Sequence, residues 1–342
     1  MISGDGAMRD GRLFEAFLNR HDEDAWQRIL AELEPHIHEV DRVATRIWFH
    51  FFPLSLAQAL QEAEDPQALA RELFLDGKYR LADQIDSSHR FLYGHRYWPE
   101  VKRALIEYAQ SPRTLQTLEL AGHIREVASH VAERRRIEPS LVVGITAVAF
   151  MTLQQVGWAA FEAAPGTIAL DPQIAARTPE EVLAYRARDD RQRFFYWWKY
   201  PDKVWTITFD ENDPEATFRL INRQHLTTAA AQDKRPYHLR DPRCVPNEGP
   251  IPVQCRSGSC GSCWVGVLGG AEKLSEMEEY ERRRLREFGY IETEEPKPII
   301  RLACQARAFG AVSIVIPPWN GVFGRFLRKW KQQRSMELTG TP

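Results

Sequence analysis

The strongest constraint on this chain is the spacing of four cysteines in its last third. Three of them form a C-x4-C-x2-C triplet and the fourth follows at a distance; they are Cys255, Cys260, Cys263 and Cys304. A loop that turns three cysteines toward one point needs residues that tolerate unusual backbone dihedrals, and Gly258 and Gly261 meet that need. We therefore expect a lean, glycine-rich loop, closed by a strand that brings the fourth cysteine.

This spacing is typical of a 2Fe–2S cluster. Two irons and two sulfides need four thiolate ligands, which the four cysteines supply. One alternative is a zinc site, but zinc ribbons favour two separated C-x2-C pairs and only one is present. Another is a set of disulfides, which would leave Cys244 without a partner and would suit a secreted chain, whereas no signal peptide is visible. The pattern favours the cluster.

From about Val204 to Pro318 the sequence resembles a plant-type (β-grasp) 2Fe–2S ferredoxin domain. The resemblance is carried by the cysteine loop, by the strand Cys263-Trp-Val-Gly-Val-Leu-Gly-Gly and by Leu302-Ala-Cys304-Gln-Ala-Arg. It implies an α+β β-grasp fold and a one-electron carrier. Two stretches are longer than the family pattern: residues 224–254, and the gap before Cys304 with its charged run Glu276 to Arg286. They bear on the docking surface and the reduction potential, not on the cluster.

The whole chain predicts a multidomain, cytoplasmic protein. Its 342 residues suit two domains, and its 45 basic and 47 acidic residues give no support for nucleic-acid binding. The most apolar run, residues 141–151, is too short to span a bilayer. The expected order is a flexible N-terminus at 1–20, a helical domain at 21–200, a 2Fe–2S ferredoxin domain at 201–318 and a basic tail at 319–342.

The first two hundred residues predict helices separated by Pro and Asp. Asp65 before Pro66 is a helix cap, and Thr178-Pro-Glu-Glu181 forms a capping box. The segment 140–163 is apolar on most faces, so its helix should be central and buried. Six or more helices in roughly 170 residues predict an all-α domain of globin size.

Two segments of this helical region resemble the globin-coupled-sensor and protoglobin group. They are Thr45-Arg-Ile-Trp-Phe-His-Phe-Phe-Pro53, similar to the second helix of the group, and 128–144, similar to its proximal-histidine helix and the start of the next. The resemblance implies a globin-like fold and heme b, with His130 as iron ligand and Phe49 and Val127 in the heme pocket. His123 is the rival ligand.

Only one of the two histidines can bind one heme iron from this helix, because seven residues separate them by about 10 Å along its axis. The alternative is that both are ordinary helix histidines and that no heme binds. Phe49 occupies a position where the group often has a tyrosine, and phenylalanine cannot donate a hydrogen bond to bound O2. With heme present, binding of CO or NO would therefore be favoured over stable O2 storage.

Neither a G-x-G-x-x-G fingerprint nor a P-loop is present in the sequence. We therefore expect a separate redox partner of the ferredoxin reductase type. The first functional hypothesis is that single electrons pass between that reductase and a heme that binds O2/NO-type gaseous ligands, with NO dioxygenase-like activity as one option. The alternatives are a gas or redox sensor without turnover, and a ferredoxin with a heme-free helical docking domain.

Two further contacts are expected. The tail from Gly321 to Arg334 is basic and partly amphipathic, so it suits a membrane surface, an acidic redox partner, or folding back on the protein as a helix. The helical domain offers a surface for a homodimer.

Overall fold

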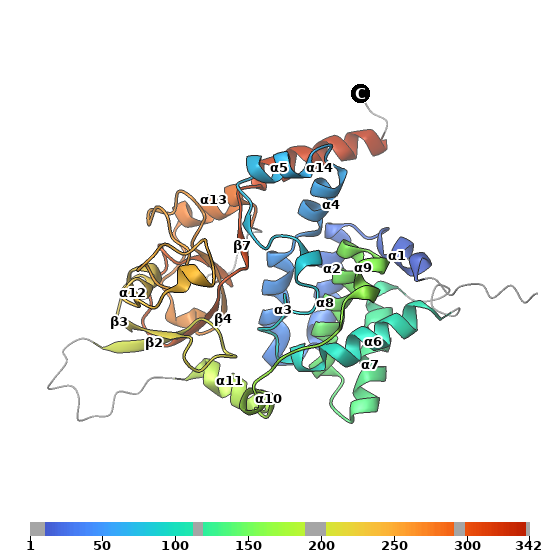
Figure 1. The fold of residues 1–342 in the computed structure, drawn as a ribbon, viewed down its shortest axis with the longest axis horizontal. Helices are drawn as coiled ribbons and strands as arrows, with labels where there is room; N and C mark the ends of the chain where they lie inside the picture. Colours follow the sequence, from blue (N-terminus) through green and yellow to red (C-terminus); the bar gives the residue numbers. More distant parts are fainter. Residues whose placement is uncertain (1–10, 112–118, 189–202, 291–297, 340–342) are drawn as a thin grey trace, which may run out of the picture. The chain divides into compact units, whose positions relative to one another are not determined.

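The computed structural model describes residues 11–111, 119–188, 203–290 and 298–339 (Figure 1). Contacts between residues divide the chain into two compact units. The helical unit consists of Met1–Trp48 and Arg80–Leu170, and the sheet unit consists of Phe49–Tyr79 and Asp171–Pro342. The predicted boundary near residue 200 lies outside the described residues, so the domain limits stay a prediction.

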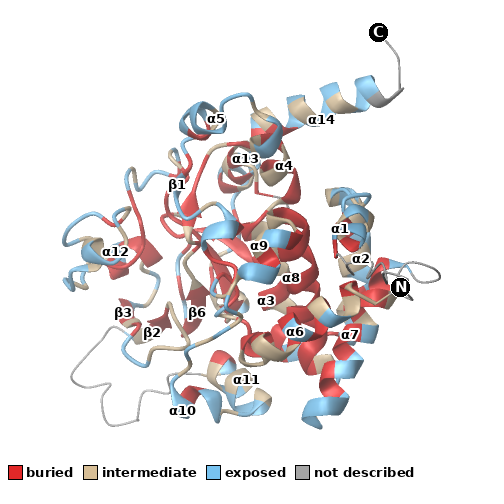
Figure 2. Ribbon diagram, turned by 45° about the vertical axis from the view of Figure 1, so that its right-hand side comes forward, coloured by how far each residue is buried: buried red, intermediate tan, exposed pale blue. Residues whose placement is uncertain are grey.

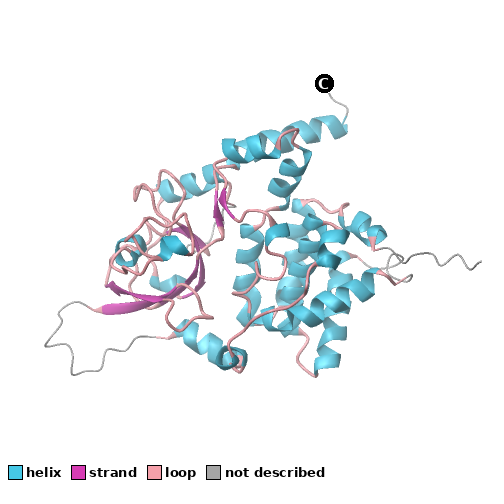
Figure 3. Cartoon of the chain, in the orientation of Figure 1, coloured by secondary structure: helices cyan, strands magenta, loops and turns pink. Residues whose placement is uncertain are grey.

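Helices make up the regular structure described for the helical unit (Figure 3). Its α-helices are α1 (Arg12–Leu18), α2 (Glu23–Leu33), α3 (Glu39–Phe51, up to Trp48), α6 (Trp98–Ala109), α7 (Leu120–Arg135), α8 (Ser140–Val156) and α9 (Trp158–Ala163). Short 3-10 helices are η1 (Glu34–His36), η2 (Leu81–Asp83) and η3 (Tyr93–Tyr97). The predicted all-α character of this region is confirmed, which leaves its globin identity open.

Helix α8 forms the core of the helical unit, as its apolar sequence predicts. Nearly all of its residues are buried, and it contacts α6, α7 and α9 (Figure 2). The helix ends earlier than the predicted Ala163, because Gly157 adopts a φ of 80° and α9 starts anew after it. Helix α1 lies within the stretch expected to be a flexible N-terminus, with Phe14 and Leu18 fully buried.

The helical unit also buries two histidines against each other. The Nδ1 atoms of His89 and His95 lie 2.9 Å apart, and the His89 ring lies 3.9 Å from the ring of Trp98. Burial lowers the pKa of His95 to about 4, with the nearby Arg90 and Arg96 adding to the shift. Burial and the neighbouring His95 also lower the pKa of His89. Both rings are therefore neutral near pH 7.

The sheet unit contains a five-stranded mixed sheet in the order β3-β2-β6-β4-β5. Its strands are β2 (Val204–Thr208), β3 (Thr217–Ile221), β4 (Trp264–Gly269), β5 (Ile300–Leu302) and β6 (Val312–Val315). Strands β2 and β6 run parallel, with Ile207 opposite Val312, and the other neighbours run antiparallel. This mixed sheet fits the predicted α+β ferredoxin domain.

Helices complete the sheet unit. They are α4 (Leu54–Glu62), α5 (Pro66–Glu72), α10 (Pro172–Ala175), α11 (Pro179–Ala187), α12 (Leu226–Ala230), α13 (Glu279–Phe288) and α14 (Gly324–Thr339), with 3-10 helices η4 (Tyr237–Leu239) and η5 (Ala271–Lys273). The Asp65 side chain accepts hydrogen bonds from the first turn of α5, and Thr178 and Glu181 form the expected capping box of α11. Both predicted helix starts are confirmed.

A segment from the first quarter of the chain belongs to the sheet unit. Strand β1 (Asp76–Gly77) pairs antiparallel with β7 (Trp319–Asn320). The Trp319 indole donates to the Phe51 carbonyl at 2.7 Å, and the Phe51 ring meets the Trp264 ring edge-on at 5.1 Å. Trp264 of β4 thus packs against Phe51, far before it in the sequence, and Trp319, far after it.

The basic tail forms helix α14, which is mostly exposed (Figure 2). Arg334 on this helix forms an ion pair with Glu62 of α4 at 2.6 Å. Folding back of the tail as a helix is one of the options that its sequence allowed. Among the described residues, none of the helices combines the length and apolar character needed to cross a membrane.

Candidate metal centre

The loop that holds the cysteine triplet turns sharply, as its glycines predict. Gly258 and Gly261 have φ angles of 75° and 77°. A Cβ on Gly261 would lie 2.9 Å from the Phe288 ring, and one on Gly258 would lie 3.0 Å from the Tyr280 ring. The loop therefore needs glycine for its dihedrals and for the close approach of α13.

The four cysteines lie in two pairs. Cys260 is close enough to lower the pKa of Cys255, and Cys263 and Cys304 are close enough to shift the pKa of each other. The pairs are close enough for Cys255 to act electrostatically on Cys304, and for Cys260 to act on Cys263. Among the described residues, no three His, Cys, Asp or Glu side chains gather into a site for a single metal ion. The loop and the turn that follows β5 nevertheless place the four predicted ligands close to one another.

One cysteine of each pair favours the thiolate form that iron requires. Burial raises the pKa of Cys255, but hydrogen bonds from Ser259, Ser257 and Cys260 outweigh it and lower the pKa to about 5. The hydrogen bond from Cys263 lowers the pKa of Cys304, and the same bond, together with burial, raises the pKa of Cys263.

Neighbouring groups form hydrogen bonds with the sulfur atoms. The Ser259 amide donates to Cys255 Sγ at 3.3 Å. The Gln305 side chain donates to Cys304 Sγ at 3.4 Å. Ser262 Oγ lies 3.1 Å from Cys260 Sγ and accepts from the Gln254 amide, so its own hydrogen is available to the sulfur. The donors to the sulfurs stabilise negative charge at the site.

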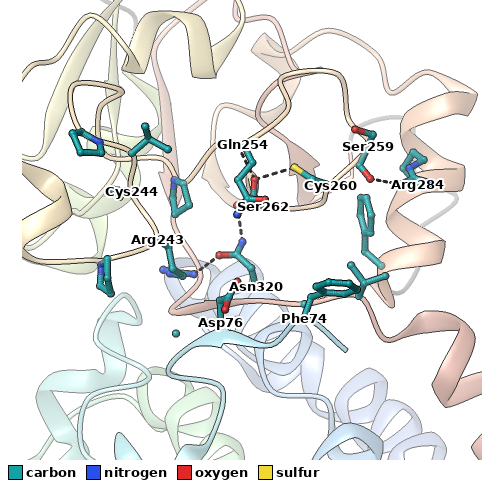
Figure 4. Close-up of a pocket in the computed structure, with 18 residues that line it drawn as sticks. Phe74, Asp76, Arg243, Cys244, Gln254, Ser259, Cys260, Ser262, Arg284 and Asn320 are labelled. Carbon is teal, nitrogen blue, oxygen red and sulfur yellow. Dashed lines mark hydrogen bonds between the residues drawn. The ribbon is translucent and has the colours of Figure 1, made fainter. Parts of the chain in front are cut away.

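Helix α13 clamps the loop from outside. Tyr280 donates its hydroxyl to the Ser257 carbonyl at 3.1 Å. The Arg284 guanidinium donates to the Gly258 carbonyl at 3.2 Å and to the Ser259 carbonyl (Figure 4). Sequence reasoning treated this charged run as an insertion and missed these contacts. The signal was present, since Tyr280, Arg284 and Phe288 are spaced by four residues and share one helix face.

A buried ion pair fixes α13 to the strand that leads to Cys304. Arg301 of β5 donates to both carboxylate oxygens of Glu281 at 2.9 Å, and the side chains are 1% and 2% exposed. The Leu302 amide donates to the same carboxylate at 2.7 Å. The helix that holds the cysteine loop is therefore also fixed to the strand that leads to the fourth predicted ligand, Cys304.

A cavity of about 800 Å³ opens beside the loop, and Cys260 is part of its lining (Figure 4). On one side Asn320 bridges two groups: it accepts from Arg243 at 2.8 Å and donates to the Ser262 carbonyl at 2.5 Å. Cys244 also lines this cavity; burial raises its pKa to about 11, and its thiol donates to the Pro250 carbonyl. This fifth cysteine is set apart from the two pairs.

The residues expected around a heme differ in how far they are exposed to solvent. His130 is exposed on α7, and Val127 is buried. His123 is buried, with its Nδ1 atom 2.7 Å from the Tyr108 hydroxyl. Phe49 is half-buried and belongs to the sheet unit. The expected ligand is thus the exposed histidine, and the rival is the buried one.

Comparison with known families agrees with this site. Residues 246–309 match the family model of the 2Fe-2S iron-sulfur cluster binding domain, and this range contains all four cysteines. The sheet unit therefore carries a ferredoxin-type domain for a 2Fe–2S cluster, and its function is electron transfer. The match lies outside the helical unit, so it gives no support for a globin or for heme. No solved structure matches the chain.

Proposed function

We propose that this protein is a one-electron carrier that exchanges electrons with a separate redox partner of the reductase type. The observation that supports it most is the match of residues 246–309 with the 2Fe-2S cluster binding domain, because this range contains Cys255 and Cys260 as one neighbouring pair and Cys263 and Cys304 as the other. Each pair would serve one iron of a 2Fe–2S cluster. When bound, the cluster supplies a centre that takes up and gives away one electron.

The residues of the chain then have defined tasks. The four cysteines would hold the irons as thiolates. Ser262, Gln305 and the Ser259 amide donate hydrogen bonds to the sulfurs, which favours the more negative, reduced state. Arg284 and Tyr280 hold the loop backbone in place, so that the site changes little between oxidation states.

The test is reconstitution of the full chain with iron and sulfide. We expect about two irons and two sulfides per chain and, after reduction, the electron paramagnetic resonance signal of a 2Fe–2S cluster. Cys263→Ser should lose most of the cluster, whereas Cys244→Ser, the matched control, should keep it. A protein that retains one zinc and no sulfide, or that loses the cluster in both variants alike, would refute the proposal.

The heme hypothesis for the helical unit stays a prediction. An iron ligand normally lies within the heme pocket, so the exposed side chain of His130 favours the third interpretation, a heme-free docking domain. Heme added to the full chain decides the matter: a Soret band that is lost in His130→Ala and kept in His123→Ala would support the gas-binding electron carrier or sensor. Without any such band, both heme hypotheses fail.

A further inference from the structure

We propose that the cavity beside Cys260 binds an uncharged quinone, which takes electrons from the reduced protein. This inference rests on the proposed function, because it needs a reduced cluster as donor. It goes further by naming a small organic acceptor and its binding site.

The cavity has the size and position for such a ligand. Its volume of about 800 Å³ lies within the range of about 300–1,000 Å³ that is usual for small-molecule sites. All its lining residues belong to the sheet unit, and one of them is the cluster ligand Cys260. A quinone ring bound there would lie next to Cys260 Sγ, through which an electron would leave the cluster.

The lining combines apolar walls with a few fixed polar groups, which is typical of ligand pockets. The walls include Phe74, Pro242, Val245, Pro246, Pro252 and Val322. Arg243 and Asn320 are held in place by their own hydrogen bonds; the Arg243 side chain is 9% exposed and also donates to Asp241 and to the Pro317 carbonyl (Figure 4). The polar groups are therefore ordered before a ligand arrives.

The charges around the cavity favour a neutral ligand. Both cations of the lining are matched by carboxylates, Arg243 by Asp241 and Arg284 by Glu287. The carboxylate of Asp76 is also part of the lining. A cluster held by four thiolates is negative in both oxidation states. A phosphate-bearing ligand such as a flavin nucleotide would be repelled, whereas a quinone ring would not.

Phe74 places an aromatic ring at the edge of this cavity, although its own backbone adopts an unfavourable conformation. The amides of Phe74 and Leu75 bond back to the Arg71 and Ala70 carbonyls, which makes Phe74 the left-handed residue that ends α5. Its φ is 52°, where glycine is usual, and its side chain is 69% exposed. An exposed phenylalanine in such a conformation suggests a functional role, here contact with an aromatic ligand.

Reduction of the quinone to the hydroquinone needs two electrons and two protons. The quinone takes one electron from the reduced protein in each of two steps and two protons from water, which gives the hydroquinone. The separate reductase of the proposed function returns one electron to the protein after each step.

The first experiment measures binding without turnover. The oxidised full chain is dialysed to equilibrium against ubiquinone-1, and we expect saturable binding that an equal concentration of flavin mononucleotide does not displace. Phe74→Gly removes the ring but suits the left-handed backbone, so the protein should fold at least as well while its affinity falls about tenfold. Phe309→Ala, which removes an exposed ring of the sheet unit outside the cavity lining, is the matched control and should bind normally.

The second experiment follows reoxidation of the reduced protein by ubiquinone-1 in a stopped-flow instrument. The rate should saturate with quinone, and Phe74→Gly should need about ten times more quinone for half-saturation. A rate that rises linearly and is equal in both proteins overturns the inference, as does displacement of quinone by flavin mononucleotide. If a reduced cluster forms and reduces cytochrome c but no quinone binds, this inference fails alone; if no cluster forms, the proposed function fails with it.

Discussion

The buried ion pair between Glu281 and Arg301 offers a sharp test of how α13 supports the metal centre. Glu281→Gln keeps the size and one acceptor of the side chain but removes its charge. The Arg301 guanidinium would then remain buried, 1% exposed, beside an uncharged amide. Breaking a buried pair by removal of one partner typically costs about 3–5 kcal/mol, because the remaining charge is not compensated. We expect a loss of this size in the free energy of opening of α13 and β5.

Hydrogen exchange of peptides that cover residues 279–290 and 298–306, measured as urea is raised, reports this free energy for the elements concerned. Glu279→Gln on the same helix is the matched control. Its carboxylate lies 2.9 Å from Arg286 but is 78% exposed, so the loss should stay below about 1 kcal/mol. The variant Glu281→Gln should also release its cluster faster, because Arg301, on the strand that leads to Cys304, is held less firmly.

A second variant tests whether the loss of stability comes from the uncompensated charge of Arg301. Replacing both Glu281 and Arg301 by Met removes the uncompensated charge, so much of the lost stability should return. If Glu281→Gln opens within 1 kcal/mol of the unchanged protein, or no more readily than Glu279→Gln, the pair is not the anchor of α13 and the reasoning is wrong.

Three other predictions follow from contacts described above. Gly261→Ala should strongly reduce cluster content after reconstitution, since its Cβ would lie 2.9 Å from the Phe288 ring at a φ of 77°; normal content would contradict the loop geometry. Ser262→Ala should lower the reduction potential by an amount on the order of tens of mV, as measured by a redox titration, because Cys260 Sγ loses a donor. The helical unit should lose about 3 kcal/mol of stability as pH falls from 6.5 toward 4, since the folded-state pKa of His95 is lowered to about 4 and the unfolded chain binds the proton first; urea unfolding of His95→Asn should show a flatter pH profile.

Sequence reasoning was strongest where the determinants are local. The cysteine spacing predicts the 2Fe–2S domain, and the two loop glycines predict the sharp turn that Gly258 and Gly261 adopt, because a short loop has few backbone solutions. The helix starts at Asp65 and Thr178 are confirmed for a similar reason, since a cap involves neighbours only three residues away. The end of α8 was missed because Gly157 was not taken as a stop within an apolar run.

Long-range pairing is the part that a single sequence does not provide. Glu281 looks like any solvated residue of a charged helix until Arg301, twenty positions later, is placed beside it. In the same way the exposure of His130 depends on how the helical unit packs, and no spacing along α7 determines it. The cavity beside Cys260 requires segments as far apart in the sequence as Phe74 and Val322, so no motif predicts it.

The pairing of β1 with β7 also has a consequence for how this protein is made. Asp76 and Gly77 leave the ribosome long before Trp319 and Asn320, their strand partners. During that interval the whole of Arg80–Leu170 is synthesised and can fold, while the early segment Phe49–Tyr79 has nothing to pair with. The part of the cavity wall that this segment provides is therefore completed only after Trp319 and Asn320 have been synthesised. Iron and sulfide should therefore be loaded most effectively once β1 has paired with β7.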